Sequence, residues 1–307
     1  MPPQYLQFFP SFLCNQRCGF CFNRGVEGQR EMPLTAVRQL GAVAASEGIG
    51  EIDILGGEPT LYPSLEGTVE SFAGRGLRMC LSSNGADPGR LARLSMAYPP
   101  EVLRIGVSIT ADSVPGALDD YISRFTPLLK GICTKDRRVG PSVKRHLTLP
   151  GITYFHLFMD TLRPEDFGTA VPYFTYREIL EELHADHPNI GGVACAGFVP
   201  DPSIELELDA VRCPAGTTKL SVMPDGSVYP CYLFFRNPTF RLGSILDDDF
   251  TLIWKHPVLG FFRNFGGNVC PRTDCPFFEV CHGGCPALAL LFSGDLAAPD
   301  PRCVPPW

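Results

Sequence analysis

The most informative stretch of the sequence is residues 14–22, CNQRCGFCF, in which three cysteines are separated by three and then two other residues. Three thiolates at this spacing can surround one [4Fe–4S] cluster and leave its fourth iron without a protein ligand. A structural zinc site is the alternative, but it requires a fourth Cys or His, and no His lies close in the sequence. The spacing therefore favours an iron–sulfur cluster on Cys14, Cys18 and Cys21 with one open iron.

Around this stretch, apolar runs alternate with helical patterns over the first two thirds of the chain. This alternation predicts an α/β fold with a parallel sheet wrapped by helices, and six strands predict an open, partial (β/α)6 barrel over residues 1–200. The predicted strands lie near residues 7–12, 52–55, 78–82, 104–109, 153–159 and 192–196, and the predicted helices near 35–47, 64–73, 88–96, 117–129 and 176–185.

The pattern changes after about residue 200. A hairpin is predicted from residues 219–223 and 228–232, because Pro224-Asp225-Gly226 between them is a turn sequence. A short helix is expected over residues 250–262. Regular structure is otherwise so sparse that we expect bound metal to hold this region together. We therefore predict a second, cysteine-rich domain over residues 201–307.

The sequence contains 13 cysteines, and ten of them fall into two groups at opposite ends of the chain. In a cytosolic protein such a density indicates metal binding or catalysis, whereas in a secreted one it would indicate disulfides. Cys80, Cys133 and Cys195 stand alone in apolar contexts, where we expect small buried side chains. The second group consists of Cys213, Cys231, Cys270, Cys275, Cys281, Cys285 and Cys303.

Composition excludes several classes of partner. The formal net charge is −7 and the basic residues are scattered, so nucleic acid and anionic lipid are not expected partners. No apolar run approaches the roughly 20 residues that cross a bilayer. The first residues also lack the pattern of a secretion signal. We predict a cytoplasmic protein.

CNQRCGFC resembles the CxxxCxxC signature of the radical S-adenosylmethionine (SAM) superfamily, with Phe20 as the aromatic residue before the third cysteine. The resemblance implies that Cys14, Cys18 and Cys21 carry a catalytic [4Fe–4S] cluster whose open iron binds the methionyl amine and carboxylate of SAM. In that family, reductive cleavage of SAM yields a 5′-deoxyadenosyl radical that abstracts hydrogen from a substrate.

Three further motifs follow predicted strands, where α/β barrels place their chemistry. Residues 56–59, GGEP, are similar to the family segment whose backbone and carboxylate bind the methionyl amine. Residues 82–85, SSNG, resemble its [ST]NG segment, and residues 107–110, VSIT, resemble its SxD segment with Thr110 in place of Asp. The SAM-binding residues that this resemblance implies are Gly56, Gly57, Glu58, Ser83, Asn84 and Ser108.

A cation is also expected for the methionyl carboxylate. Arg124 or Lys130, in the stretch after the fourth predicted strand, could supply it. Each could equally be a solvated helix charge.

The second cysteine group resembles the SPASM domain, a C-terminal domain that binds auxiliary iron–sulfur clusters. MPDGSVYPC at residues 223–231 and CHGGCPA at residues 281–287 carry this resemblance. It implies two auxiliary [4Fe–4S] clusters, which makes three clusters in all. One auxiliary cluster would be held by Cys270, Cys275, Cys281 and Cys303, and the other by Cys213, Cys231 and Cys285. The latter has no evident fourth thiolate, so it either keeps an open iron or recruits Cys195.

Enzymes of this architecture mostly modify ribosomally made peptides or proteins, by cross-linking, epimerisation or oxidation. A peptide is therefore the expected substrate, with ferredoxin or flavodoxin as electron donor. Only thirteen residues precede Cys14, so we expect any leader-binding domain to be a separate partner. A small-molecule substrate, such as a haem precursor or sugar, and a non-catalytic electron-transfer or accessory role are the alternatives.

Two features bear on the reaction without deciding it. Tyr232 follows Cys231, at the position where sulfatase-maturing relatives have an Asp, which argues against formylglycine formation. This tyrosine could relay a proton or electron, or could simply pack in the hairpin. Residues 132–150 are basic and poorly patterned, as expected of a mobile lid, a docking loop for acidic peptides or a solvated loop.

Overall fold

The computed structural model describes residues 2–23, 25–26, 31–109, 114–135, 139–159, 164–193, 213–272, 274–276 and 282–304. Seven consecutive strands pair in parallel and in sequence order. They are β1 (Tyr5–Phe8), β2 (Glu51–Ile54), β3 (Arg78–Ser83), β4 (Leu103–Ser108), β5 (Leu128–Cys133), β6 (Tyr154–Phe158) and β7 (Ile190–Val193).

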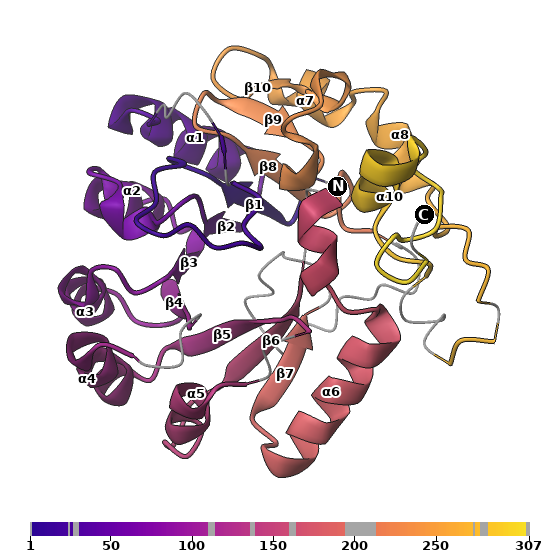
Figure 1. The fold of residues 1–307 in the computed structure, drawn as a ribbon. Coiled ribbons are helices and arrows are strands. Elements are labelled where there is room, and N and C mark those ends of the chain that lie inside the picture. Colours follow the sequence, from indigo (N-terminus) through magenta and orange to yellow (C-terminus); the bar gives the residue numbers. More distant parts are fainter. Residues whose placement is uncertain are drawn as a thin grey trace.

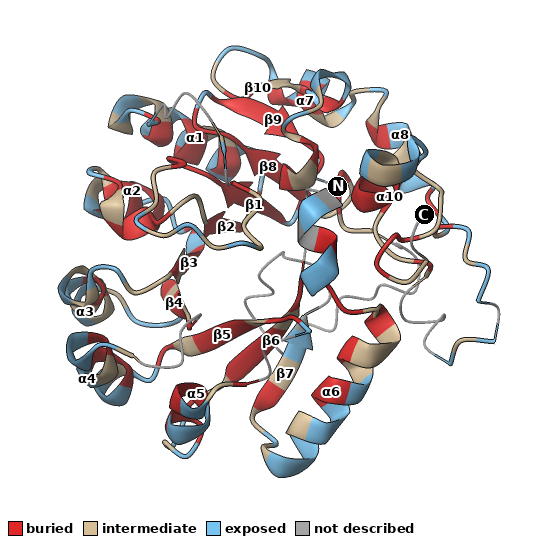
Figure 2. Cartoon of the chain, in the orientation of Figure 1, coloured by how far each residue is buried: buried red, intermediate tan, exposed pale blue. Residues whose placement is uncertain are grey.

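Helices cover the outer side of this sheet, which curves as an open arc (Figure 1). Figure 2 shows the strands largely buried and the helices buried mainly on the side that faces the sheet. The predicted partial barrel is confirmed. The helices are α1 (Leu34–Ser46), η1 (Pro59–Leu61), α2 (Leu65–Ala73), α3 (Pro88–Ala97), α4 (Gly116–Phe125), α5 (Pro141–His146), η2 (Pro164–Thr169) and α6 (Tyr173–Asp186).

Strand β5 is an element that the sequence analysis does not predict, because it assigns residues 117–129 to one helix. Helix α4 instead ends at Phe125, since Thr126 adopts a left-handed φ of 43° and Pro127 cannot continue the helix. The β5 sequence LLKGIC lacks a strand pattern because Lys130 and Gly131 interrupt it. A Cβ atom at Gly131 would lie 2.1 Å from the Tyr154 hydroxyl on β6, which explains the glycine.

The basic stretch 132–150 also differs from its prediction. It contains the end of β5 and helix α5, and the side chain of His146 is buried with Nε2 3.1 Å from Asp119 Oδ1. Arg145 pairs with the same carboxylate at 2.6 Å. The described part therefore contains a packed helix in place of a wholly solvated loop, its lid and docking roles stay predictions, and residues 136–138 lie outside the described residues.

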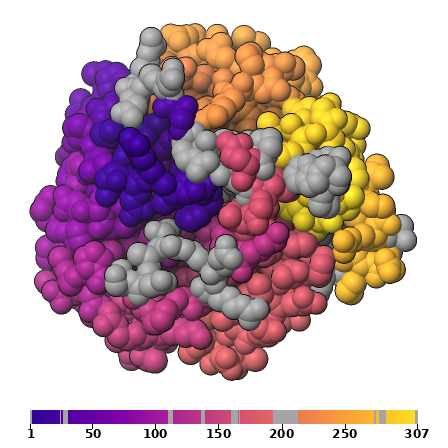
Figure 3. Space-filling model, in the orientation of Figure 1, coloured from indigo at the N-terminus to yellow at the C-terminus, as the bar shows by residue number. Residues whose placement is uncertain are grey.

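The C-terminal region extends the same sheet. β8 (Lys219–Val222) pairs in parallel with β1, and β9 (Ser227–Tyr229) and β10 (Gly243–Ser244) follow antiparallel, giving a sheet of ten strands. Leu220 and Val222 are fully buried in the core shared with the barrel. These strands therefore share the core of the barrel, which the sequence analysis does not predict, and the expectation that bound metal holds the rest of this region together stays a prediction. The space-filling view shows the orange C-terminal residues packed beside the indigo N-terminal ones (Figure 3).

The remaining elements cover this extension. The single helix predicted over residues 250–262 is two helices, because Pro257 interrupts it. None of the described helices is both long and apolar enough to cross a membrane. The elements are η3 (Tyr232–Phe234), η4 (Pro238–Phe240), α7 (Phe250–Trp254), α8 (Leu259–Arg263) and α10 (Pro286–Ser293).

Candidate active site

A cavity of about 240 Å³ lies at the carboxyl ends of the barrel strands. The parallel register explains why motifs far apart in the sequence meet here, since the loops after β2, β3 and β4 leave the sheet at the same edge. The structure thus brings together all four predicted motifs. Predicted site residues that line the cavity are Cys14, Cys18, Phe20, Cys21, Gly56, Gly57, Ser83, Asn84, Ser108 and Lys130.

The three thiols of the first group, those of Cys14, Cys18 and Cys21, are partly exposed and form no disulfide. The loop between them is short, with the Cys21 N–H donating to the Cys18 carbonyl at 3.1 Å. Burial raises the pKa of the Cys14 thiol, and the nearby Cys21 and Glu58 raise it further. A bound iron would reverse this preference, because a coordinating thiol is deprotonated by its metal. An all-sulfur donor set around a cavity therefore fits an iron–sulfur cluster.

Gly56 and Gly57 allow the loop after β2 to approach the cysteine segment closely. A Cβ at Gly56, whose φ is 130°, would lie 2.4 Å from the Ser11 carbonyl oxygen, and one at Gly57 would lie 2.2 Å from that of Leu13. This close approach allows two backbone hydrogen bonds. The Gly57 N–H donates to the Ser11 carbonyl at 3.0 Å, and the Glu58 N–H donates to the Leu13 carbonyl at 2.8 Å. The two glycines therefore fix the backbone directly before Cys14.

Glu58 is buried and its carboxylate joins two loops. Oε1 accepts hydrogen bonds from the backbone N–H and hydroxyl of Thr60 at 2.9 and 2.6 Å and from the Ser83 hydroxyl at 2.7 Å. Oε2 accepts from the Asn84 N–H at 2.6 Å. Because each carboxylate oxygen has two lone pairs and Oε2 accepts only this one hydrogen bond from the described residues, Oε2 can accept from one further donor. The carboxylate lies behind the cavity wall, and its contact with a methionyl amine stays a prediction.

Asn84 connects the end of β3 to the first cysteine group. Its side-chain Nδ2 donates to Asn15 Oδ1 at 2.9 Å and contacts Cys14 Sγ at 3.8 Å. The Ser83 hydroxyl accepts from the Gly85 N–H at 2.9 Å, which shapes the turn after β3. The loop after β3 thus supports both the cysteines and the cavity wall.

Of the two cations proposed for the methionyl carboxylate, only Lys130 lines the cavity. Its Nζ donates to the Ser82 hydroxyl at 2.5 Å, across β4. Burial lowers the pKa of Lys130 to about 8, although the acidic groups of Asp53, Cys80 and Glu58 oppose the shift. An ammonium held in this way suits an anionic ligand group.

The assignment of Arg124 to the site is not supported. This residue lies on α4, which covers the outer side of the sheet, and it is not among the described residues that line the cavity. Its guanidinium stacks 5.0 Å above the Phe125 ring and lies 4.0 Å from Met96 Sδ. The sequence analysis weighed Arg124 beside Lys130 because the predicted helix continued to Leu129, whereas the helix ends at Phe125 and Lys130 lies on β5.

Aromatic side chains that the sequence analysis did not assign to the site complete the wall. Phe9, Phe22, Phe155 and Phe158 line the cavity, as does Tyr232. The rings of Phe22 and Tyr232 lie 4.7 Å apart, edge to face. Because Phe22 follows Cys21 and Tyr232 follows Cys231, this contact links the two cysteine groups. The sequence analysis singled out Tyr232 by its position directly after Cys231, and the same signal, a position directly after Cys21, could have identified Phe22.

Cys270, Cys275 and Cys303 line a small cavity of about 30 Å³. Arg272 lines it too, stacked 5.0 Å above Phe174. The Cys303 Sγ accepts a hydrogen bond from the Tyr173 N–H at 3.1 Å, which ties this cavity to the start of α6. Three of the four cysteines assigned to one auxiliary cluster are therefore together, and the fourth, Cys281, lies outside the described residues.

Two of the three cysteines assigned to the other auxiliary cluster lie directly before the first residue of a helix. Cys231 precedes η3 and Cys285 precedes α10, and these helices pack against each other. Cys213 packs against the same core. The Cys285 N–H donates to Asp300 Oδ2 at 2.8 Å, and the buried Asp300 pairs with Arg302 at 2.6 Å. Cys195, the possible fourth ligand, lies outside the described residues.

The remaining cysteines behave as predicted where they are described. Cys80 and Cys133 are 2% and 1% exposed and belong to the core of the barrel. Across the described ranges, no three Cys, His, Asp or Glu side chains converge as they would on a single metal ion. The clustered thiols instead line cavities.

Comparison with known proteins agrees with this geometry. Residues 9–128 match the model of the radical SAM superfamily, and residues 213–286 match that of an iron–sulfur cluster-binding domain, SPASM. The PqqA peptide cyclase of Methylorubrum populi is 24% identical over 94% of this chain and 82% of its own. The PqqA peptide cyclase of Streptomyces rochei is 34% identical over 29% of this chain and 24% of its own.

Solved structures share the fold. SuiB of Streptococcus suis bound to S-adenosylmethionine has a TM-score of 0.76 at 18% identity, over 98% of this chain and 77% of its own. The structure of anSMEcpe with bound AdoMet has a TM-score of 0.68 at 18% identity, over 98% of this chain and 94% of its own. Both matched domains imply [4Fe–4S] clusters. The chain therefore carries a radical SAM domain, matched over residues 9–128, and a C-terminal SPASM iron–sulfur cluster-binding domain, matched over residues 213–286.

Proposed function

We propose that this protein cleaves SAM reductively and uses the resulting 5′-deoxyadenosyl radical to abstract hydrogen from a ribosomally made peptide. The observation that carries the proposal is the single cavity lined by the three thiols, the two glycines, Asn84, Ser108 and Lys130. The peptide substrate is supported by the similarity to proteins named PqqA peptide cyclase, and by the shared fold of SuiB, which was solved bound to its precursor peptide SuiA.

Cys14, Cys18 and Cys21 would hold the SAM-binding cluster as thiolates. When reduced, such a cluster supplies the electron that cleaves SAM to methionine and a 5′-deoxyadenosyl radical. Lys130 would hold the methionyl carboxylate, because it is the one Lys or Arg among the described residues that line this cavity. Glu58, with one acceptor site left on Oε2, would take a hydrogen of the methionyl amine.

The aromatic wall would protect the radical. Phe9, Phe22 and Tyr232 pack together beside the cysteines and give the cavity a largely apolar wall. Excluding water limits side reactions of a reactive intermediate. Peptide side chains would enter past this wall and present a hydrogen to the adenosyl carbon.

We also propose that the C-terminal region, from about residue 201, forms the auxiliary part of the enzyme. Cys270, Cys275, Cys281 and Cys303 would hold one auxiliary cluster, and Cys213, Cys231 and Cys285 the other. A ferredoxin or flavodoxin would supply the electron, and a separate partner could bind a leader sequence.

The experiment uses short peptides encoded beside this gene, prepared with deuterated amino acids. Reconstituted, reduced enzyme is incubated with SAM and each peptide, and mass spectrometry measures deuterium in 5′-deoxyadenosine and the mass change of the peptide. Transfer of deuterium from one peptide supports the proposal. Deuterium that comes only from a labelled small molecule, such as a haem precursor or a sugar, would overturn the peptide assignment.

A further inference from the structure

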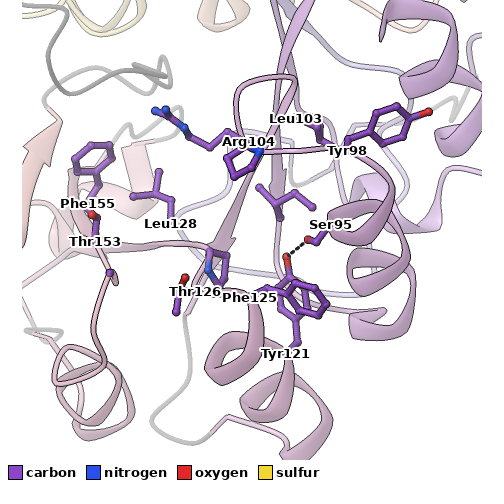
Figure 4. Close-up of a pocket in the computed structure, with 14 residues that line it drawn as sticks. Ser95, Tyr98, Leu103, Arg104, Tyr121, Phe125, Thr126, Leu128, Thr153 and Phe155 are labelled. Atoms are coloured by element: carbon purple, nitrogen blue, oxygen red, sulfur yellow. Dashed lines mark hydrogen bonds between the residues drawn. The ribbon is translucent and has the colours of Figure 1, made fainter.

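Two further cavities differ in the chemistry of their walls. One, of about 350 Å³, lies at the amino-terminal ends of β4, β5 and β6, and Figure 4 shows Arg104 among the residues that line it. No Cys, His, Asp or Glu is among its described lining residues. The other is the small cavity at Cys270, Cys275 and Cys303, which Tyr173 from the start of α6 also lines. The side chains that can hold a metal centre are therefore at the smaller cavity.

The sulfur of Cys303 accepts a hydrogen bond from the barrel. The backbone N–H of Tyr173, the first residue of α6, donates to it at 3.1 Å. The first N–H groups of a helix have no acceptor within the helix, so this N–H is available to the sulfur. The aligned peptide dipoles of α6 add partial positive charge at the same end. A thiolate at Cys303 is therefore stabilised by a group that belongs to the barrel.

The turn that carries Cys303 is fixed to the barrel. The Cys303 N–H donates to the Asp300 carbonyl at 3.0 Å, which closes the turn. The buried side chains of Asp300 and Arg302 pair within it. Arg302 Nη1 also donates to the Met159 carbonyl, just beyond β6, at 2.9 Å. The position of the Cys303 sulfur therefore depends on the same strand that precedes α6.

Phe158 connects this hydrogen bond to the active site. It lines the active-site cavity, and its ring meets that of Tyr173 edge to face at 5.4 Å. The guanidinium of Arg302 lies 4.0 Å from the centre of the same Phe158 ring. Tyr173 is 6% exposed, so its N–H donates in buried surroundings, where a hydrogen bond is electrostatically stronger than in water.

Hydrogen bonds to sulfur, net charge and solvent exposure set the reduction potential of an iron–sulfur cluster. Reduction adds negative charge to the cluster and its thiolates, so an N–H donor stabilises the reduced form more than the oxidised form. We infer that the Tyr173 N–H raises the reduction potential of the auxiliary cluster held by Cys270, Cys275, Cys281 and Cys303. The barrel thereby makes this cluster a better electron acceptor. This inference rests on the proposed ligand set and adds to it a group that tunes the cluster.

The test replaces one backbone group. Amber suppression inserts 4-hydroxyphenyllactic acid, the α-hydroxy acid of tyrosine, in place of Tyr173, so that an ester oxygen replaces the N–H and the ring is kept. The same replacement of Tyr176 is the matched control, because the Tyr176 N–H donates to the Pro172 carbonyl in the same helical turn. EPR spectra of the reconstituted holoenzyme, recorded at a series of poised potentials, measure the reduction potential. The signal of this cluster is the one that Cys275→Ala lacks.

We expect the ester at Tyr173 to make the cluster about 10-fold harder to reduce, which corresponds to a reduction potential about 59 mV lower. The ester at Tyr176 should leave the potential unchanged. Iron analysis of each protein shows whether the cluster is retained.

A second measurement leaves the backbone unchanged. In wild-type protein labelled with nitrogen-15 tyrosine, pulsed EPR should detect hyperfine coupling between the reduced cluster and a labelled nitrogen, because the hydrogen bond brings the Tyr173 nitrogen close to a cluster ligand. Tyr173→Phe keeps the N–H but not the label, so it should lose this coupling and keep the wild-type potential. This measurement decides the question even where the ester protein does not retain its cluster.

Three results would overturn the inference. They are an unchanged potential with the ester at Tyr173, an equal lowering by both esters, and no coupling to nitrogen-15 in the wild-type protein. Retention of all iron and of every EPR signal in Cys275→Ala would instead refute the proposed ligand set, and it would do so whatever the esters show.

Discussion

At the scale of single residues, the site depends on buried side chains that each connect two parts of the site. Lys130 is held by Ser82 and faces the cavity, and Glu58 joins the loops after β2 and β3. Both are buried in the barrel, where a polar group without its partners costs about 1–3 kcal/mol. Substitutions at these positions should therefore give large and separable effects.

Lys130→Met should weaken SAM binding about 10- to 100-fold, because the methionyl carboxylate loses its charged partner. Arg124→Met should leave binding unchanged, since that residue lies on the outer helix. Isothermal titration of both variants with SAM measures the difference. Equal weakening in the two variants would show that Lys130 has no special role.

SAM binding by the wild-type protein should also weaken as pH rises through about 8. The pKa of Lys130 is lowered to about 8, so the ammonium is present below that pH and lost above it. Asp53, Cys80 and Glu58 are the groups that oppose this loss of charge. A Lys130→Arg variant keeps its charge, so a titration series from pH 7 to 9 should show a flatter profile for it than for the wild type.

Glu58→Gln should destabilise the fold by about 1–3 kcal/mol, because an amide cannot accept all four hydrogen bonds and places N–H groups against other donors. Glu181→Gln is the matched control, since this exposed carboxylate pairs with Arg177 at 3.6 Å one helical turn away and should contribute less than about 1 kcal/mol. Urea unfolding of both variants measures the difference. A loss no greater than that of the control would argue against this role for Glu58.

At the scale of elements, sequence patterns identified those whose residues carry a simple periodicity. Five of the predicted helices and six of the seven parallel barrel strands lie where alternation placed them, and GGEP and SSNG follow their strands as expected. Strand β5 was not predicted because Lys130 and Gly131 break the apolar pattern of a buried strand. Lys130 is there because it faces the cavity, and Gly131 because it lies against Tyr154. Missing β5 is also why Arg124 seemed as good a candidate as Lys130.

The turn between β8 and β9 offers a test at this scale. Gly226 has a φ of 84°, and an added Cβ would lie 2.8 Å from the Leu246 side chain, so Gly226→Ala should cost about 1–2 kcal/mol. Gly260→Ala, in α8 with nothing within 4 Å, should be neutral or stabilising. Thermal unfolding compares the two. Equal effects would mean that the left-handed turn does not limit stability.

At the scale of the whole molecule, the two cysteine groups belong to one folded unit. β8 pairs with β1, and Tyr232 contacts Phe22, so the C-terminal region completes the wall of the active site. No sequence pattern predicted the pairing of β1 with β8, because residues 5–8 and 219–222 are far apart in the sequence and meet only in the folded chain. The ligand sets of the second group were available only through family resemblance.

Cys275→Ala should remove about four irons per chain and leave SAM cleavage intact, since its cavity is separate from that of Cys14, Cys18 and Cys21. Cys80→Ala, a buried core cysteine, should retain all iron. Iron analysis of the reconstituted variants measures this. Unchanged iron in Cys275→Ala would remove that residue from the ligand set.

The central claim is that the cavity at Cys14, Cys18 and Cys21 generates a 5′-deoxyadenosyl radical. The most direct measurement is chromatographic detection of 5′-deoxyadenosine after reconstituted enzyme is incubated without oxygen with dithionite and SAM. The account predicts that the product forms with the wild-type protein and is absent with Cys14→Ala. No product from an iron-loaded wild-type protein, or equal product from Cys14→Ala, would contradict it.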